Sequence, residues 1–315
     1  MTNYRIQNLD IPDALVTVAH GVNDLGQIAG TFELGNPNPQ AFITNPGFLG
    51  TVSLGPAPYG ALSIGSDVNN AQQLAGTSGH YQDTKRGFVR HVDGSFARLE
   101  YTNDSAFTSA YGTNDWGAAV GQAQPFDGSQ PVGVYWRLNG QIRDVYSVPG
   151  STETSANGTN NWGWVVGTYR VGANGDPSST QHGYAGWDAQ HIWGVDVPGA
   201  VSTEVYDLTN QWEIVGTFQD TSGHSHGFVD LKNHFDQIDV PGATNTFIYG
   251  ANDFGQVVGA YQLADDQPFH AFEATPDLLP TSQLAPTDPT AGLLRGGALF
   301  DPTQPTTLIS DKALS

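Results

Sequence analysis

The chain repeats one short motif six times, and this repetition limits what it can fold into more than any other feature. Two well-preserved copies are "YGANDFGQVVG" (249–259) and "GTNDWGAAVG" (112–121). Each copy holds an anchoring asparagine, and successive asparagines are 46, 45, 46, 50 and 42 residues apart. A period of this size is typical of propeller blades and of some solenoid units. The six anchors are Asn23, Asn69, Asn114, Asn160, Asn210 and Asn252.

One repeat unit has the pattern of four short strands. In the fifth unit we assign strand a to 213–219, strand b to 226–231, strand c to 235–242 and strand d to 244–250. Strands c and d alternate apolar and polar residues, and Gly, Pro, Asn and Asp separate the four segments. Four strands in about 45 residues predict a propeller blade.

The two ends of the chain complement each other. The last unit supplies only strands a (255–261) and b (270–275). The N-terminal "YRIQNLDIPDALVTVAHGVND" aligns with "FDQIDVPGATNTFIYGAND", which covers strands c and d. We therefore predict an all-β, six-bladed β-propeller of four-stranded blades over residues 1–275. A composite blade, with N-terminal strands c and d and C-terminal strands a and b, closes the ring and protects the strand edges.

Residues 276–315 do not follow the repeat. The segment is rich in proline and contains the apolar run "LLRGGALF" (293–300). We predict an extension that packs on the propeller, with disorder as the alternative.

Composition narrows the possible partners. The 315 residues carry a net charge of −20, only 13% of them are charged, and there is no cysteine. No basic surface exists to neutralise phosphates, so nucleic acid and anionic membranes are excluded as partners. A small molecule, a carbohydrate or a cation stays compatible with this charge. Oligomeric state is open.

Three histidines recur at one repeat position. His182, His226 and His270 open strand b, and Asp196, Asp239 and Asp10 end the strand c that faces each of them. Because the pair recurs from blade to blade, we interpret it as a cross-strand contact that stabilises the repeat, and not as a catalytic or metal site. The pairing of His270 with Asp10 supports ring closure.

The motif around these histidines resembles a known family. The run "GxNDxGQVVGxY", then "HAF" (270–272), "HGF" (226–228) or "HGY" (182–184), then "IDVPGA", is similar to the bacterial HAF-repeat family over about residues 1–275. The resemblance implies a β-propeller-like repeat protein that is often exported, and it supplies no catalytic residues. The N-terminal "MTNYRIQNLDIP" shows no signal peptide, so the chain as written is predicted to be cytoplasmic.

Functional residues are expected where the repetition fails. The position three residues before each anchor differs in almost every blade, and loops from all blades converge at a channel mouth. We predict that these six side chains lie at one height around one channel. They are His20, Ser66, Tyr111, Asn157, Asp207 and Tyr249.

We assign provisional roles to this set. His20 is the candidate general base or acid, and Asp207 is its partner, which would raise the pKa of the imidazole. Tyr111 and Tyr249 are proton donors, and Ser66 and Asn157 bind substrate. The alternative is a water-filled channel lined by polar residues.

The asparagine turns also suggest a cation. Asp24, Asp115 and Asp253 each follow an anchor. Asn and Asp before glycine are ordinary tight-turn residues, so a structural role is the first interpretation. The alternative is Ca²⁺ or another divalent cation held by oxygen ligands at the mouth. Trp116, Trp162 and Trp212 follow the same turns, and we expect them to pack between blades.

Two functions of different classes remain. The first is a small-molecule enzyme at the channel mouth that uses acid/base or metal-assisted chemistry, such as hydrolysis, elimination or cyclisation. The second is a propeller that binds carbohydrate or protein without chemistry.

Overall fold

A computed structural model describes residues 3–35, 38–44, 51–53, 62–79, 85–102, 106–173, 176, 178–232 and 234–277, with only the backbone described at 51–53. The chain divides into two units, residues 1–276 and 277–315. The predicted C-terminal extension therefore lies outside the described residues. The described residues contain no helix that is long and apolar enough to cross a membrane.

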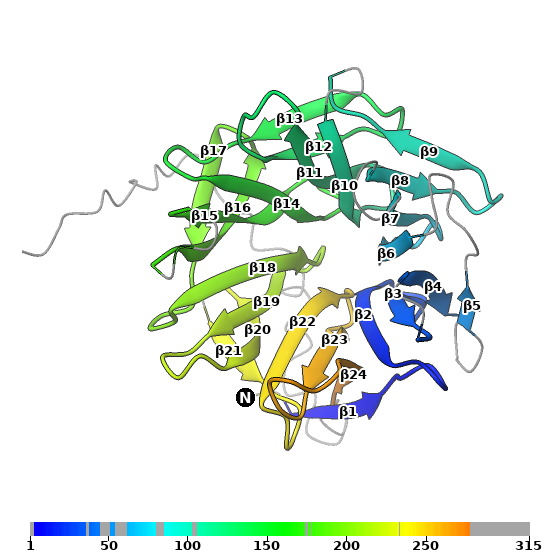
Figure 1. Ribbon diagram of the computed structural model, residues 1–315, viewed down its shortest axis with the longest axis vertical. Coiled ribbons are helices and arrows are strands. Elements are labelled where there is room, and N and C mark those ends of the chain that lie inside the picture. The colour runs from blue at the N-terminus through cyan, green and yellow to red at the C-terminus, as the bar shows by residue number, and fades with distance from the viewer. Residues whose placement is uncertain are drawn as a thin grey trace, which may run out of the picture. The chain divides into compact units, whose positions relative to one another are not determined.

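The first unit is a six-bladed β-propeller, as predicted. Its strands form six antiparallel four-stranded sheets arranged in a ring (Figure 1). One strand of each blade contacts the equivalent strand of both neighbouring blades, so these six strands surround the central axis. The innermost strands of blades one to six are β2 (Val16–Val22), β6 (Leu62–Val68), β10 (Ala106–Thr113), β14 (Glu153–Thr159), β18 (Ser202–Leu208) and β22 (Asn245–Ala251).

The remaining strands follow outwards in each blade. The second strands are β3 (Ile28–Glu33), β7 (Leu74–Gly79), β11 (Ala119–Pro125), β15 (Val165–Val171), β19 (Glu213–Gln219) and β23 (Val257–Gln262). The third strands are β4 (Gln40–Thr44), β8 (Arg86–Arg90), β12 (Val132–Trp136), β16 (Thr180–Asp188), β20 (Ser225–Leu231) and β24 (His270–Pro276). The outermost are β5 (Thr51–Ser53), β9 (Phe96–Leu99), β13 (Ile142–Tyr146), β17 (His191–Val195), β21 (Phe235–Ile238) and, in blade six, β1 (Tyr4–Asn8).

The composite blade differs from the prediction in one respect. The N-terminus contributes one strand to it, β1, and not two: the order in blade six is β1-β24-β23-β22. Strand d at the N-terminus is β2, which opens blade one and pairs with β3. The reason is the asparagine turn, which joins each strand d to the next strand a in a tight hairpin and so makes them partners within one blade.

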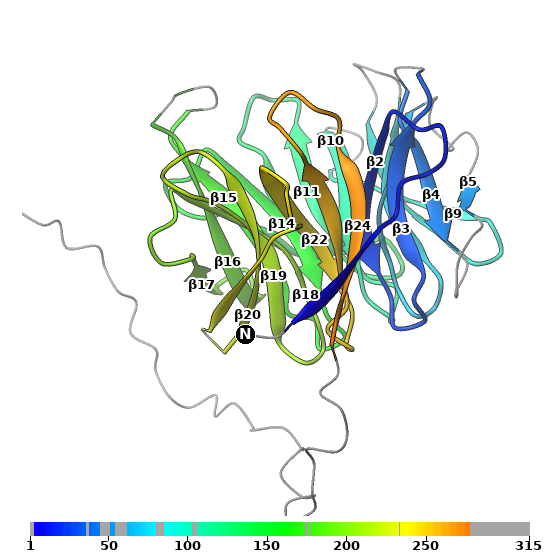
Figure 2. The same ribbon diagram turned by 90° about the horizontal axis from the view of Figure 1, so that it is seen from below.

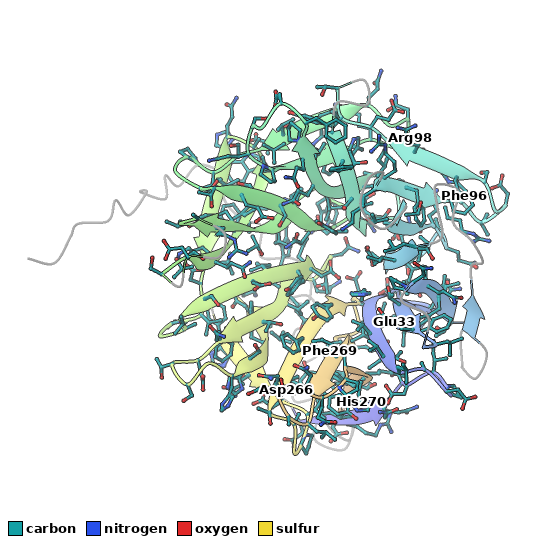
Figure 3. All side chains as sticks on the ribbon, in the orientation of Figure 1. Glu33, Phe96, Arg98, Asp266, Phe269 and His270 are labelled. Carbon is teal, nitrogen blue, oxygen red and sulfur yellow. The ribbon has the colours of Figure 1, made fainter. Side chains whose placement is uncertain are left out.

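The His–Asp pairs are confirmed as cross-strand contacts. His182 Nδ1 lies 3.0 Å from Asp196 Oδ2, and His226 Nδ1 lies 3.0 Å from Asp239. His270, at the start of β24 (Figure 3), lies 2.7 Å from Asp10, which also accepts the backbone N–H of Ala271. This last pair joins residues 260 positions apart in sequence and fastens the N-terminal segment to the last blade.

A closed ring of six hydrogen bonds links the blades at the asparagine turns. In each turn the residue after the anchor donates its backbone N–H to the side-chain oxygen of the equivalent residue in the next blade, at 2.7–2.9 Å. The last bond runs from Asp253 N to Asp24 Oδ1 and closes the circle. We call this the amide ring; it comprises Asp24, Asn70, Asp115, Asn161, Asn210 and Asp253.

A second ring is formed by the anchors themselves. The side-chain amide of each anchoring asparagine donates to the backbone carbonyl of the next anchor, as from Asn23 to Asn69 (2.9 Å) and from Asn252 to Asn23 (3.1 Å). In blade five the anchor is Thr209: its hydroxyl accepts the turn N–H groups of Gln211 and Glu213, as the asparagine oxygens do elsewhere. Threonine has no amide to donate onward to Asn252, so this anchor ring lacks its sixth donor.

The recurring "VVG" glycine is required by the approach of two strands. A Cβ on Gly121 would lie 1.9 Å from Ser109 O, and one on Gly259 would lie 1.8 Å from Phe247 O. Both oxygens belong to the adjacent innermost strand, so no larger residue fits there without displacing backbone. Buried apolar residues of neighbouring blades complete the core, for example Val215, Ile248 and Phe272 in one cluster.

We predict that Thr209→Asn stabilises the propeller. The new amide would donate to Asn252 O, as the other anchors do in their blades, and its oxygen would keep the two turn bonds. One added buried hydrogen bond should raise the free energy of unfolding by about 1 kcal/mol. Urea denaturation measures the change.

The opposite change at an intact anchor serves as the comparison. Asn114→Ala removes bonds to Asn160 O, Trp116 N and Ala118 N and should cost about 3 kcal/mol. Asn139 lies in an exposed outer turn, where its side chain hydrogen-bonds to Gln141 alone among the described residues. Asn139→Ala should therefore lower the free energy of unfolding by much less than Asn114→Ala does. Equal losses in Asn114→Ala and Asn139→Ala would contradict a special role for the anchors.

We also predict that removing residues 1–8 leaves a folded but weakened ring. The deletion exposes the edge of β24 and removes Tyr4 and Ile6, which pack partly buried on the core of blade six. The expected loss is about 2–3 kcal/mol, together with faster hydrogen exchange confined to β24. A truncated chain that melts like the full chain would show that β1 does not close the ring.

Candidate functional site

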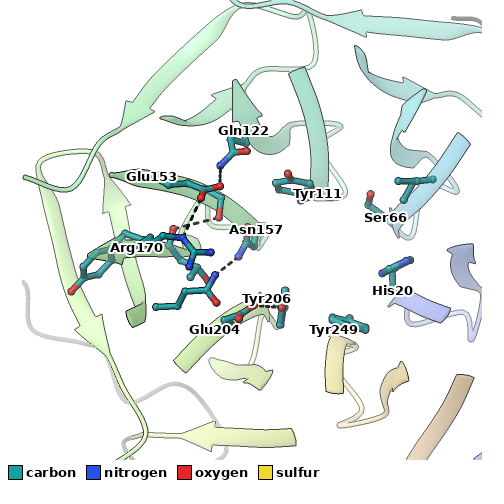
Figure 4. A pocket seen from close by; sticks show the side chains of 15 residues that line it. His20, Ser66, Tyr111, Gln122, Glu153, Asn157, Arg170, Glu204, Tyr206 and Tyr249 are labelled. Carbon is teal, nitrogen blue, oxygen red and sulfur yellow. Dashed lines mark hydrogen bonds and ion pairs between the residues drawn. The ribbon is translucent and has the colours of Figure 1, made fainter. Parts of the chain in front are cut away.

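Two cavities occupy opposite ends of the propeller channel. In β14, Glu153, Ser155 and Asn157 line one cavity, and the residues that follow, from Thr159 on, line the other. The first, which we call the upper cavity, has a volume of about 330 Å³ and is lined by the side chains drawn in Figure 4. It lies toward the beginnings of the innermost strands, whose ribbons Figure 2 shows in the view turned by 90°. The second, the lower mouth, is surrounded by the asparagine turns.

A β-bulge turns one residue of every innermost strand toward the upper cavity. The register of each innermost strand slips by one residue at the same place, as between Ala19 and Gly21 or between Val205 and Asp207. A bulge re-aims the extra side chain, and here it does so in all six blades. The bulge residues, all of which line the upper cavity, are His20, Ser66, Tyr111, Asn157, Tyr206 and Tyr249.

Five of these six were predicted from the sequence, and Asp207 was wrong. The prediction counted back three residues from Asn210. The anchor of blade five is Thr209, so the count started, and ended, one residue too far along the chain. Tyr206 takes the bulge position instead. Asp207 corresponds to Gly21 of blade one and lines the lower mouth, so it is no partner for His20 in the upper cavity.

Asp67 and Asp207 follow the bulge residues of blades two and five and line the lower mouth. Asp67 accepts the backbone N–H of Val68 and of Thr113, and Asp207 accepts those of Leu208 and Ala251. Burial raises the pKa of Asp67 to about 7, and burial with the charge of Asp67 raises the pKa of Asp207 well above its usual range. Each aspartate therefore ties its own blade to the next one.

His20 lies in an aromatic environment without a carboxylate partner. Its ring lies 5.4 Å from the ring of Tyr249, which meets Tyr206 edge-on at 4.9 Å. Burial lowers the pKa of His20 to about 4, whereas the sequence analysis expected a carboxylate to raise it. The imidazole is therefore neutral at pH 7. It can donate one hydrogen bond and accept another, but it does not hold the second ring proton that a general acid would give up.

The structure places Glu204 beside Tyr206 in the same wall of the cavity. The Tyr206 hydroxyl donates a hydrogen bond to Glu204 Oε2. Burial raises the pKa of Glu204 above its ordinary value, although the tyrosine bond opposes the shift. Burial also keeps the pKa of Tyr206 well above its usual range, so the hydroxyl remains a donor.

A charged network extends this wall. Arg170 Nε lies 3.5 Å from Glu153 Oε2, and Gln122 donates to the other oxygen of Glu153 at 2.9 Å (Figure 4). Gln181 connects the network to Glu204 when its amide is oriented so that both ends have partners: its carbonyl then accepts from Arg170 Nη2 at 2.8 Å, and its NH2 group faces the Glu204 carboxylate. One guanidinium thus lies between two carboxylates at the cavity.

The sequence contains a signal for Glu153 and Glu204 that was missed. Side chains two residues apart on a strand point to the same face, so the residues two and four before each bulge also face the channel. Glu204 stands two before Tyr206, and Glu153 stands four before Asn157. Arg170 gave no such signal, because it comes from the second strand β15 and reaches the cavity only through the fold.

The other predicted residues that line the cavity differ in their hydrogen bonds and burial. Asn157 donates to Val205 O at 2.7 Å and to Thr168 Oγ1 at 3.2 Å, so its amide holds blades four and five together. Tyr111 is buried in protein, which raises its pKa, and Ser66 lies on β6 (Figure 4).

The aspartates predicted as weak cation ligands belong to the amide ring. Asp24, Asp115 and Asp253 each accept a backbone N–H and at least one asparagine amide from a neighbouring blade. Among the described residues, no group of three or more His, Cys, Asp or Glu has a geometry that could hold a metal ion. Calcium binding stays a prediction.

Two of the tryptophans contradict the expected packing between blades. Trp116 and Trp162 are each 71% exposed, and Phe254 at the same position is 70% exposed. Trp212 does not share that position: it takes the left-handed conformation (φ 68°) that glycine adopts in other turns, such as Gly117. The aromatic side chains therefore project from the turns around the lower mouth.

We predict that His20 makes stability depend on pH. Its pKa is about 4 in the folded chain and near 6.5 when unfolded, so the unfolded state binds the proton first as pH falls. The stability that neutral His20 contributes is present above pH 6.5 and is lost toward pH 4, by about 2 kcal/mol between pH 7 and pH 5.

The measurement compares melting temperatures of the wild type and His20→Gln at pH 7 and pH 5. Between pH 7 and pH 5, the melting temperature of the wild type should fall further than that of the variant. Equal losses in both proteins would show that the imidazole is not shielded from protonation.

Comparisons with known proteins bear on the fold. A scan against known protein families and a search of curated proteins both find no match. Among solved structures, a virginiamycin B lyase from Staphylococcus aureus is 12% identical, with a TM-score of 0.47, covering 88% of this chain and 100% of its own. TolB from Acinetobacter baumannii is 9% identical (TM-score 0.50; 84% and 64% covered), and Aleuria aurantia lectin with bound α-methyl-L-fucoside is 12% identical (TM-score 0.45; 87% and 99%). At 9–12% identity, these similarities concern the fold alone.

Proposed function

We propose that the chain is a small-molecule enzyme whose site is the upper cavity and whose chemistry is proton transfer, as in elimination, cyclisation or hydrolysis. The cavity of about 330 Å³ holds one small ligand, and groups from all six blades converge on it. A single observation carries the proposal: a carboxyl group, Glu204, is held by a tyrosine hydroxyl and linked through Gln181 to a guanidinium, all facing one cavity.

Each member of this group suits a role in acid–base chemistry. Burial moves the pKa of Glu204 upwards, toward the working range of a general base. Arg170 offers a fixed positive charge to a developing anion, and Tyr206 offers a hydroxyl. Substrate deprotonated by Glu204 would thus find its negative charge stabilised by neighbours already in place.

His20 takes a different role from the one expected of it. A neutral imidazole with a pKa near 4 is a weak base, so we assign it to hydrogen bonding with substrate, together with Tyr111, Tyr249, Ser66 and Asn157. Asp207 is left out of the reaction, since it lies below the cavity. A metal-assisted route would need a divalent cation, which metal analysis and a melt with and without EDTA would reveal.

A second function, binding of carbohydrate without chemistry, is favoured by the cavity's lining. Four tyrosines, a neutral histidine and the amides of Gln122 and Gln181 offer aromatic faces and uncharged hydrogen-bonding groups. Such groups suit the apolar faces and hydroxyls of a sugar. Protein-binding is the remaining alternative for the ring as a whole.

Membership of the HAF-repeat family is also a proposal. The histidines of the "HGY", "HGF" and "HAF" motifs each pair with an aspartate at the same place in their blades, which gives the motif a structural meaning. Export, which the family implies, would be tested by locating the protein in fractionated cells.

The variant Glu204→Gln tests the enzyme. It keeps the shape and an acceptor for Tyr206 but cannot take a proton, so turnover should fall by roughly 10²- to 10⁴-fold. Because the substrate is unknown, the protein is incubated with a metabolite extract and an oligosaccharide library. Mass spectrometry then follows which compounds are consumed.

Glu33→Gln, on β3 outside the cavity, is the matched control and should behave like the wild type. Consumption of a compound by the wild type and the control but not by Glu204→Gln supports the proposal. If all three bind a compound equally and none changes it, the chain is a binding protein. Equal turnover by all three would remove Glu204 from the mechanism.

A further inference from the structure

The face opposite the upper cavity carries exposed apolar side chains around the lower mouth. They occupy one position of the asparagine turn, two residues after the anchor, in four of the six blades. Leu25 is 48% exposed and the other three are 70–71% exposed. We call these four residues the turn rim: Leu25, Trp116, Trp162 and Phe254.

The turn rim is held in place by the turns that carry it. Trp116 Nε1 donates to the backbone oxygen of Asn161 in the next blade at 2.9 Å. The backbone N–H groups of Leu25, Trp116, Trp162 and Phe254 each donate to the oxygen of their anchor at 3.1 Å. An aromatic face that is exposed and already oriented loses little entropy when a partner binds it.

The mouth inside the turn rim carries negative charge without compensation from basic side chains. Of the described residues that line it, five are aspartates and none is Lys, Arg or His. They are Asp24, Asp67, Asp115, Asp207 and Asp253. Because burial raises the pKa of Asp67 and of Asp207, the charge that the mouth offers a partner rests on Asp24, Asp115 and Asp253. The net charge of the whole chain, −20, has the same sign. Aromatic faces around carboxylates complement a cation, because both the ring faces and the carboxylates attract positive charge.

We propose that this face docks an arginine-bearing segment of a partner protein. Guanidinium groups lie flat on Trp116, Trp162 and Phe254 and point their N–H groups at the aspartates of the mouth. Arginine fits this surface better than lysine because its planar group stacks on aromatic rings and pairs with carboxylates through two bonds at once.

Charge distinguishes this occupant from the obvious alternatives. A second copy of the chain would bring its own Asp24, Asp115 and Asp253 against the mouth, so like charges would oppose the contact. A neutral sugar would use the aromatic faces and leave the carboxylates unused. The proposal is independent of the chemistry of the upper cavity, which lies at the other end of the channel.

The test uses three nine-residue Gly/Ser peptides carrying three Arg, three Lys or three Glu residues. Binding is measured by fluorescence anisotropy in 150 mM NaCl, about the ionic strength at which long-range attraction is screened beyond roughly 8 Å. We expect the Arg peptide to bind more tightly than the Lys peptide and the Glu peptide not to bind. The triple variant Trp116→Ala/Trp162→Ala/Phe254→Ala keeps every charge and should weaken the Arg peptide by about tenfold.

The matched control removes three other exposed apolar residues, which lie at the upper end and are 53–62% exposed, in the variant Leu15→Ala/Phe126→Ala/Leu263→Ala; it should bind within twofold of the wild type. Melting curves confirm that both triple variants are folded. Equal binding by both variants would reduce the effect to net charge and overturn the proposal. Failure of the Arg peptide to bind, or self-association of the wild type that the rim variant abolishes, would also overturn it.

Discussion

The amide ring is the constraint on which the rest of this propeller depends. Blades touch one another mainly through side chains, and a ring of blades needs a fixed number of directional contacts if it is to close. Six backbone N–H groups meet six side-chain oxygens at 2.7–2.9 Å, and the sixth bond, from Asp253 to Asp24, exists only when the circle is complete. Asn and Asp recur in the motif because their short side chains place an acceptor oxygen next to the backbone N–H of the neighbouring blade.

Because the blades are joined at the turns, the channel-facing side chains in the upper half of each innermost strand are free to differ between blades. Scaffold contacts concentrate at the turn, at the close glycine such as Gly121 and at the outer His–Asp pairs. The bulge residue and the residues two and four before it serve no contact that all blades share. They therefore differ from blade to blade, and the same strand that is repetitive at the turn carries Glu204 and Tyr206 a few residues earlier.

Features that recur in every repeat unit were predicted from the sequence, and features in which one unit departs from the others were missed. Strand number, blade number and the His270–Asp10 contact followed from alignment of the units. Asp207 was misplaced because threonine replaced asparagine as the anchor in one blade, and a hydroxyl is as good a turn acceptor as an amide oxygen. The pKa of His20, the approach of Arg170 and the exposure of Trp116 depend on three-dimensional surroundings that no repeat alignment contains.

The position that follows each bulge shows how one residue restricts the residues of neighbouring blades. At the position after the bulge, four blades have glycine and two, diametrically opposed, have aspartate. A Cβ on Gly21 would lie 2.4 Å from Asp67 Oδ1, and one on Gly158 would lie 2.8 Å from Asp207 Oδ1, so the blade before each aspartate must keep glycine. The other oxygen of each aspartate bonds to the blade after it. Each aspartate thus lies against the glycine of the blade before it and bonds to the blade after it, so it links three consecutive blades.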